Sequence, residues 1–216
     1  MSKQKKSRQD FEKKINTKTK SVHIDEISGR YLFREVLEGD LEDLKQLDTN
    51  LFSEPYYDNY YTSLVNPKYY AQVVEDKETN RIVGECIARV KYSKKLEQKT
   101  AYILTLGVTY EASHCGIGFN LLKNCVEFYH NEKKLNKTTL NVAQLNIRAF
   151  TFYKRFGFTI LKSIPKYYSG GEMGRAAYKM LYKYTKETEN IKNQEIPSTN
   201  KVIKFFKKLF TLKRNK

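Results

Sequence analysis

The stretch from residue 101 to residue 122, AYILTLGVTYEASHCGIGFNLL, constrains the fold of this chain more than any other. Its first half, from Tyr102 to Val108, is a run of aromatic, aliphatic and β-branched residues that is typical of a buried strand. After a short polar loop, Gly116 and Gly118 open an apolar segment of helix-forming residues. The pattern therefore predicts a strand, a glycine turn and a helix.

A glycine turn at the start of a helix is suited to anion binding. Unpaired backbone N–H groups point outward there, the positive end of the helix dipole lies behind them, and glycines let the main chain approach a phosphate. The G-x-G pattern alone is a weak signal, and a simple tight turn is the alternative interpretation. Neither G-x-G-x-x-G nor Gly-Lys-Ser/Thr occurs here, so the Rossmann and P-loop fingerprints are both absent.

Length and composition predict a single cytoplasmic domain with additional tails. The chain of 216 residues is long enough for one domain of about 150 residues with a hydrophobic core. No apolar run reaches the roughly 18 residues of a membrane span, and the lysine-rich N-terminus has no apolar signal core. The three cysteines have no paired or metal-type spacing, so they are predicted to be reduced thiols, and with three histidines no metal site is expected.

The positive charge is concentrated in the two tails. The formal net charge is +16, and residues 1–20 and 197–216 carry 13 of these charges. The rest of the chain is nearly neutral, so the domain itself lacks the excess of basic residues that is typical of a nucleic-acid-binding domain.

A second pattern lies downstream, in LNVAQLNIRAFTFYKRFGF at residues 140–158. Asn146 begins a helical pattern there, Tyr153 follows seven residues later, and an aromatic-Gly-aromatic triplet closes it at residues 156–158. This block resembles the N-x-x-A-x-x-F-Y-x-x-x-G-F block of the GCN5-related N-acetyltransferase (GNAT) superfamily, whose pyrophosphate loop reads Arg/Gln-x-x-Gly-x-Gly/Ala. Every fixed position of the block is matched, by Asn146, Ala149, Phe152, Tyr153, Gly157 and Phe158.

The resemblance implies an α/β (α+β) fold of the GNAT type, with a mixed, mostly antiparallel central sheet of about seven strands flanked by helices. We assign this domain to residues 27–185. Residues 1–26 lack hydrophobic periodicity and are predicted to be a disordered basic arm, residues 186–200 a polar linker, and residues 201–216 a basic amphipathic helix. Within the domain, strands are expected at residues 31–37, 69–74, 82–91, 102–108, 140–142, 157–164 and 175–184, and helices after Gly39-Asp40 and from Asn146 to Arg155.

The resemblance also implies acetyl-CoA as the cosubstrate. In the family, the end of the strand and the glycine loop hold the diphosphate, and the later block flanks the pantetheine arm. The corresponding positions are Leu106, Gly107, Val108, His114, Cys115, Gly116, Ile117, Gly118, Phe119, Asn146 and Tyr153. Ser113 and His114 stand where family members have Arg or Lys, so the charge-assisted part of the binding is reduced and weaker affinity for coenzyme A is expected.

The strand itself points to a substrate class. Residues 102–108 resemble the Y-I-L/M-S/T-L-G-V/C strand of two related N-alpha-acetyltransferases, one associated with chromatid cohesion and one with the Golgi. The resemblance implies that protein or peptide N-termini, expected to start with Met, are acetylated on their free α-amine. The aromatic segment at residues 51–61 resembles the substrate-side loop of these enzymes, and packing over a core edge is the alternative. The implied substrate-binding residues are Phe52, Tyr56, Leu104, Tyr167 and Tyr168.

Two residues are implied in catalysis. In the family, the α-amine attacks the thioester directly while a Tyr and a His hold a water that draws the proton away. Tyr102 occupies the Tyr position, and because a phenol with a pKa near 10 is a poor base we assign it as a water-orienting group, with core packing as the alternative. Asn141 occupies the His position, and an amide can hold a water but cannot accept its proton.

Two other functions stay open at this point. A lysine acetyltransferase of the histone type is one, but the lysine amine has a pKa near 10.4 and needs stronger base assistance than Asn141 offers. A catalytically weakened homologue that binds coenzyme A as a scaffold is the other.

The last segment, VIKFFKKLFTLKRNK, has the pattern of a basic amphipathic helix. Its apolar residues recur at spacings of three and four, and these are Val202, Phe205, Phe206, Leu209 and Phe210. We favour reversible peripheral contact with the cytosolic face of an internal membrane such as the Golgi. Docking on the domain or a partner, a calmodulin-type target and contact with nucleic acid or the ribosome are the alternatives.

Overall fold

The structure, a computed structural model, describes residues 26–27, 29–52, 56–94, 97–169 and 174–185. A single mixed sheet of eight strands runs through it in the order β1-β2-β3-β4-β5-β6-β8-β7. The strands are β1 Glu26–Ile27, β2 Tyr31–Glu35, β3 Tyr69–Asp76, β4 Arg81–Ser93, β5 Gln98–Val108, β6 Lys137–Ala143, β7 Thr159–Ile164 and β8 Ala177–Lys183. The helices are the 3-10 helix η1 Glu38–Asp40 and the α-helices α2 Leu41–Leu51, α3 Asp58–Ser63, α4 Ile117–Asn131 and α5 Ile147–Phe156.

The predicted mixed, mostly antiparallel sheet is confirmed. Every neighbouring pair of strands is antiparallel except β5 and β6, which are parallel. The eighth strand, beyond the expected seven or so, is the two-residue β1 at one edge. None of the helices in the described ranges is long and apolar enough to cross a membrane.

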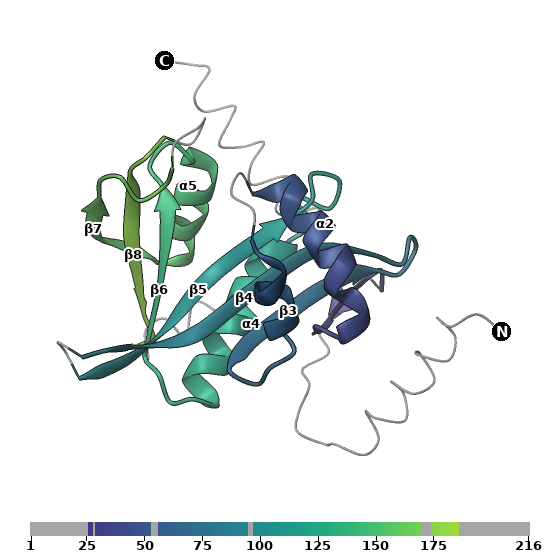
Figure 1. The fold of residues 1–216 in the computed structure, drawn as a ribbon, viewed down its shortest axis with the longest axis horizontal. Helices are drawn as coiled ribbons and strands as arrows, with labels where there is room; N and C mark the ends of the chain where they lie inside the picture. Colours follow the sequence, from purple (N-terminus) through teal and green to yellow (C-terminus); the bar gives the residue numbers. More distant parts are fainter. Residues whose placement is uncertain (1–25, 28, 53–55, 95–96, 170–173, 186–216) are drawn as a thin grey trace, which may run out of the picture.

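The parallel pair is the feature that positions the site. Strands β5 and β6 are in register at only two positions, Ala101 with Thr138 and Tyr102 with Thr139. Beyond Tyr102 the two strands separate, and Figure 1 shows them fanning apart toward their C-terminal ends. A register shift between Ile87 and Ala88 leaves Leu104 without a partner position on β4, so a bulge marks the place where β5 turns away.

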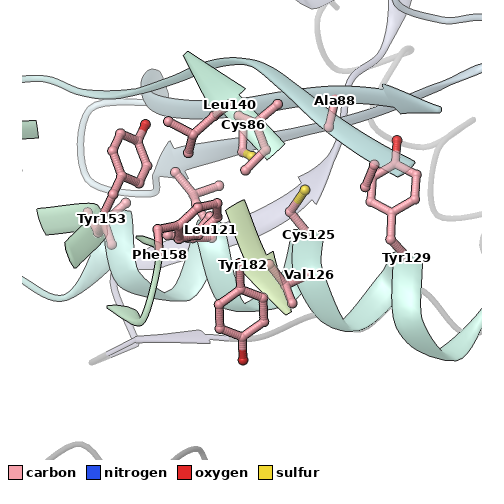
Figure 2. Packing of buried hydrophobic residues seen from close by; sticks show 14 of the residues in the cluster. Cys86, Ala88, Leu121, Cys125, Val126, Tyr129, Leu140, Tyr153, Phe158 and Tyr182 are labelled. Carbon is pink, nitrogen blue, oxygen red and sulfur yellow. The ribbon is translucent and has the colours of Figure 1, made fainter. Parts of the chain in front are cut away.

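Two hydrophobic cores cover the two faces of the sheet. Helices α4 and α5 pack on one face around a core that includes Cys86 of β4 and Cys125 of α4, both buried and free (Figure 2). Helices α2 and α3 pack on the other face, where Leu44 and Leu47 of α2 are buried. Figure 1 shows α2 in front of the sheet and α4 behind it.

Helix α3 was not expected from the sequence. The aromatic segment at residues 51–61 was predicted to be a substrate-side loop or to pack over a core edge, and its last part enters α3, where Tyr61 is buried and Tyr60 is half-buried. Tyr60 and Tyr61 are neighbours on a helix that packs onto the sheet, so tertiary burial outweighs the absence of a helical pattern in so short a segment.

The predictions for the tails fall outside the described residues. The basic arm before residue 26, the linker from residue 186 and the amphipathic segment at residues 201–216 stay predictions from sequence. The limits of the domain at residues 27 and 185 also stay predictions.

Candidate active site

Three polar side chains meet where β5 and β6 separate. Tyr102 lies on β5 at the last position paired with β6, and Asn141 lies on β6 two residues beyond that point. The amide Nδ2 of Asn141 donates to the Tyr102 hydroxyl at 3.1 Å. The hydroxyl of Tyr167, from the loop between β7 and β8, lies 3.2 Å from the Tyr102 hydroxyl. The structure thus brings together the two predicted catalytic residues and one predicted substrate-binding tyrosine.

The environment of Tyr102 keeps its phenol neutral. Its side chain is only 8% exposed. Burial, followed by the neighbouring hydroxyl of Tyr167, raises the pKa of Tyr102 well above its usual value near 10. A phenol held neutral in this way can donate to and accept from a water, but it cannot act as the base that removes a proton at pH 7.

Asn141 has one hydrogen-bonding atom left over. Its Oδ1 is buried and has no partner among the described residues. Leaving a buried carbonyl oxygen without a hydrogen-bond partner destabilises the fold, so such an atom commonly accepts a hydrogen bond from an ordered water. The amide of Asn141 therefore holds Tyr102 with one atom and offers an acceptor for a water with the other.

The ammonium of Lys91 on β4 also contacts this group, and no sequence pattern predicted this contact. Its Nζ lies 3.2 Å from the centroid of the Tyr102 ring. This is a cation–π contact, which depends on the register between β4 and β5 and so is not visible in a local pattern.

An aromatic wall borders the other side of the site. The ring of Phe52, at the end of α2, lies against β5 so closely that a methyl group built on Gly107 would stand 3.0 Å from it. Tyr56 stacks on Tyr60 with ring centroids 4.3 Å apart. Leu104, turned out by the bulge, packs into the same cluster as Tyr56. Three of the predicted substrate-binding residues therefore line one wall.

The remaining predicted substrate-binding residue joins the site from the opposite side. Tyr168 packs edge-on against Tyr167, with ring centroids 4.8 Å apart. Burial raises the pKa of Tyr56, and smaller contributions come from Glu85, Asp48 and these two tyrosines. Tyr56 is therefore within electrostatic reach of both tyrosines.

Two buried carboxyl groups lie behind the aromatic wall, and sequence reasoning missed them. Glu85 of β4 is fully buried with no partner for either oxygen in the described part of the chain, and Asp48 of α2 is 3% exposed. The hydroxyl of Tyr61 donates to Asp48 Oδ2 at 3.2 Å. Burial raises the pKa of Asp48 to about 6, and burial together with Asp48 raises that of Glu85 well above its usual value. The one available signal was an acid within the apolar strand pattern IVGECIA.

The glycine turn has the conformation that an anion site requires. Gly116 immediately precedes α4 with φ of +83°, and His114 is also left-handed with φ of +64°. The N-terminus of α4 has no side-chain cap, so the first backbone N–H groups, from Ile117 onward, are available to a ligand. Gly118 faces the end of β5, because a methyl group built on it would lie 3.7 Å from Val108. The residues present fit the diphosphate of coenzyme A.

The other predicted cofactor residues fall in two groups. Leu106, Gly107 and Val108 form the last part of β5, and Cys115 and Phe119 flank the turn, so these residues are brought together with it. Asn146 caps α5 by accepting from the Ala149 N–H at 3.0 Å, and Tyr153 is buried in the core. These contacts give Asn146 and Tyr153 a structural role in the fold. Their role in binding the pantetheine arm stays a prediction.

Comparison with known proteins agrees with this geometry. The Acetyltransferase (GNAT) family matches residues 37–158, which is more than half of the chain. Comparison with curated proteins gives no match.

Solved structures of similar fold include those of several N-alpha-acetyltransferases and of a spermidine/spermine N-acetyltransferase. Arabidopsis thaliana Naa50 in complex with the bisubstrate analogue CoA-Ac-MVNAL is 29% identical, with a TM-score of 0.62 over 72% of this chain and 99% of that one. Arabidopsis thaliana NAA60 with a bisubstrate analogue is 22% identical, with a TM-score of 0.64 over 72% and 98%. Chaetomium thermophilum Naa20 with a bisubstrate analogue is 23% identical, with a TM-score of 0.63 over 77% and 92%. The chain belongs to the GNAT family and is an acetyltransferase that uses acetyl-CoA.

Proposed function

We propose that the protein is an N-alpha-acetyltransferase that moves an acetyl group from acetyl-CoA to the α-amine of protein N-termini, with Met-starting ones favoured. The observation that carries the proposal is the hydrogen-bonded set of Tyr102, Asn141 and Tyr167 opposite the aromatic wall of Phe52 and Tyr56. The similarity to Naa50, whose bisubstrate analogue contains a peptide that begins with Met, supports it.

The site chemistry fits an α-amine better than a lysine side chain. An α-amine has a pKa near 8, so about a tenth of it is neutral at pH 7, whereas a lysine amine with a pKa near 10.4 is almost entirely protonated. The described hydroxyl and amide groups at the site can hold a water, but none of them is a base near neutral pH. A site of this kind suits the amine that loses its proton more readily.

The reaction needs no covalent intermediate on the protein. The neutral α-amine attacks the thioester carbonyl carbon, a C–N bond forms, and the C–S bond breaks with its electron pair on sulfur. The nitrogen gives up one proton through the water held by Tyr102 and Asn141, and the coenzyme leaves as its thiol. Positioning of the two reactants accounts for most of the rate in such a scheme.

The test is acetyl transfer from labelled acetyl-CoA to a panel of peptides. The panel contains free N-termini that begin Met-Lys, Met-Leu, Met-Ala and Ser-Glu, and an N-blocked peptide with an internal lysine. We expect transfer to the Met-starting peptides. Tyr102→Phe, which removes the hydroxyl that orients the water, should lower kcat by about 10- to 100-fold, and Asn141→His, which introduces a base, should raise it. Tyr92→Phe, at an exposed position on β4, is the matched control and should match the wild type.

Two results would contradict the proposal. Transfer to the N-blocked lysine peptide alone would identify a lysine acetyltransferase. Binding of coenzyme A without transfer to any peptide would identify a scaffold.

A further inference from the structure

Positively charged residues flank the two predicted catalytic residues on neighbouring strands. Tyr102 pairs in register with Arg89 of β4, and Asn141 pairs with Lys179 of β8. Lys179 in turn pairs with Lys162 of β7. Partners in register on antiparallel strands project from the same face of a sheet. Three cations therefore lie on the face that carries the site.

Lys91 adds a fourth cation to this group. Its ammonium lies 3.2 Å from the centroid of the Tyr102 ring, which places it at the site itself. We call Arg89, Lys91, Lys162 and Lys179 the cationic rim. Arg89, Lys91 and Lys162 are exposed and Lys179 is half-buried, so a ligand on this face of the sheet can reach them.

No carboxylate among the described residues neutralises the cationic rim. The ion pairs in the described part of the chain involve other residues. Burial lowers the pKa of Lys91, and the charges of Arg89 and Lys179 lower it further. These cations therefore repel one another in the free protein, and an anionic ligand would relieve the repulsion.

The phosphates of coenzyme A do not account for the cationic rim. The glycine turn lies beyond Val108, at the end of β5, whereas Arg89 pairs with Tyr102 in the first half of that strand. Val108 lies six positions beyond Tyr102, which is about 20 Å along an extended strand. A distance of this size is longer than the reach of one side chain.

We propose that the cationic rim selects protein N-termini that carry acidic side chains directly after their first residue. The inference rests on the proposed function. The aromatic wall takes the first side chain, and the following residues of an extended peptide, each about 3.3 Å further along, pass over the cations.

The expected preference is moderate and depends on salt. Each ion pair between exposed charges strengthens binding only slightly, by about 1.5- to 5-fold in affinity. We therefore expect a preference of about 3- to 10-fold for an acidic peptide in 50 mM salt, and a much smaller one in 500 mM salt because screening shortens the range of the charges. The effect should appear in KM, because the same charges attract the peptide before and during the reaction.

The experiment compares matched peptides that differ only in charge. The reference begins Met-Leu-Gln-Gln, and in its partners Glu replaces residue 2, residue 3 or residue 4 in turn. Rates are measured with the wild type, Lys91→Met, Lys179→Met and the double variant. Lys154→Met is the control, because this substitution removes the same charge from an exposed position on α5, which packs on the other face of the sheet. We expect the double variant to lose the preference for Glu, and the control to keep it.

Three results would overturn the inference. One is an equal kcat/KM for the acidic and amide peptides with the wild type in 50 mM salt. Another is an equal loss of preference in the control variant. The third is a raised KM for acetyl-CoA in the variants of the cationic rim, which would show that these cations bind the coenzyme. A wild type that transfers acetyl to none of these peptides would instead overturn the proposed function.

Discussion

At the scale of single residues, the site combines groups that hold a water with two buried acids, of which Glu85 has no hydrogen-bond partner in the described part of the chain. Asn141 and Tyr102 make hydrogen bonds but cannot take a proton, whereas Glu85 and Asp48 can take one but lie behind the aromatic wall. A buried carboxyl group without hydrogen bonds destabilises the fold in its charged form. The two acids therefore make the stability of the protein depend on pH.

Replacing Glu85 should stabilise the protein. In the folded state the pKa of Asp48 is about 6 and that of Glu85 is raised, whereas both are near 4 in the unfolded chain. Between these values the folded state binds more protons, so stability falls as the pH rises from about 4 through 6. Glu85→Gln removes one of the two acids, so its melting temperature should exceed that of the wild type at pH 8 and the difference should shrink at pH 5.

The control for this prediction is Glu75→Gln. Glu75, on the neighbouring strand β3, accepts from Arg34 Nε at 2.9 Å, so its loss should lower the melting temperature at pH 8. Calorimetry or circular dichroism at the two pH values measures both variants. A Glu85→Gln protein that melts below the wild type at pH 8 would show that the carboxylate has a favourable partner.

At the scale of elements, the site depends on how closely α2 approaches β5. Gly107 permits this approach, because a methyl group there would lie 2.7 Å from Leu51 Cδ1 and 3.0 Å from Phe52 Cζ. Both atoms are the ends of flexible side chains, so they can move aside while the strand keeps its place. The fold should therefore tolerate an alanine, but the aromatic wall should not keep its shape.

Gly107→Ala should weaken peptide binding more than it weakens the fold. We expect KM for a Met-starting peptide to rise about 3- to 10-fold through displacement of Phe52, with a cost in stability of about 1 kcal/mol from the extra methyl group. Gly39→Ala is the matched control, because a methyl group there meets no atom within 4 Å. Steady-state kinetics and melting temperatures separate the two effects. An unchanged KM in Gly107→Ala would mean that Phe52 does not border the peptide.

The same elements explain how far the sequence could predict the structure. The strand, glycine turn and helix at residues 101–122 and the helix that begins near Asn146 were predicted because their patterns are local. Helix α3, the contact of Lys91 with Tyr102 and the approach of Asp48 to Glu85 were not, because each depends on packing or register between separate elements. In particular, Tyr102 and Asn141 are 39 residues apart, and only the parallel pairing of β5 and β6 brings them together.

At the scale of the whole molecule, the site requires the complete domain. Phe52 comes from the end of α2, Tyr102 from the centre of the sheet and Tyr167 from the loop near its far edge. Net charge alone did not reveal the cationic rim, because a nearly neutral body can still gather its cations on one face. The charge of the tails is a separate feature, since most of the +16 lies outside the domain.

The C-terminal tail should give the protein reversible affinity for anionic membranes. Residues 201–216 lie outside the described residues, and their sequence combines an apolar stripe with seven Lys or Arg and no acid. Each cation near an anionic surface contributes about 1 kcal/mol, and the Phe and Leu side chains add burial in the interface. The full chain should therefore sediment with vesicles that contain phosphatidylserine and much less with vesicles of phosphatidylcholine alone.

Three variants separate the two contributions to this binding. Deletion of residues 201–216 should abolish binding to the vesicles while acetyl transfer to a soluble peptide stays at the wild-type rate, since the acetyltransferase domain is expected to end near residue 185. Phe205→Ser with Phe210→Ser should weaken binding at every salt concentration, because burial of apolar side chains is not screened by salt. Lys204→Gln with Lys208→Gln should weaken it mainly at low salt. Equal binding by the full and shortened chains would assign the membrane contact, if any, to another part of the protein.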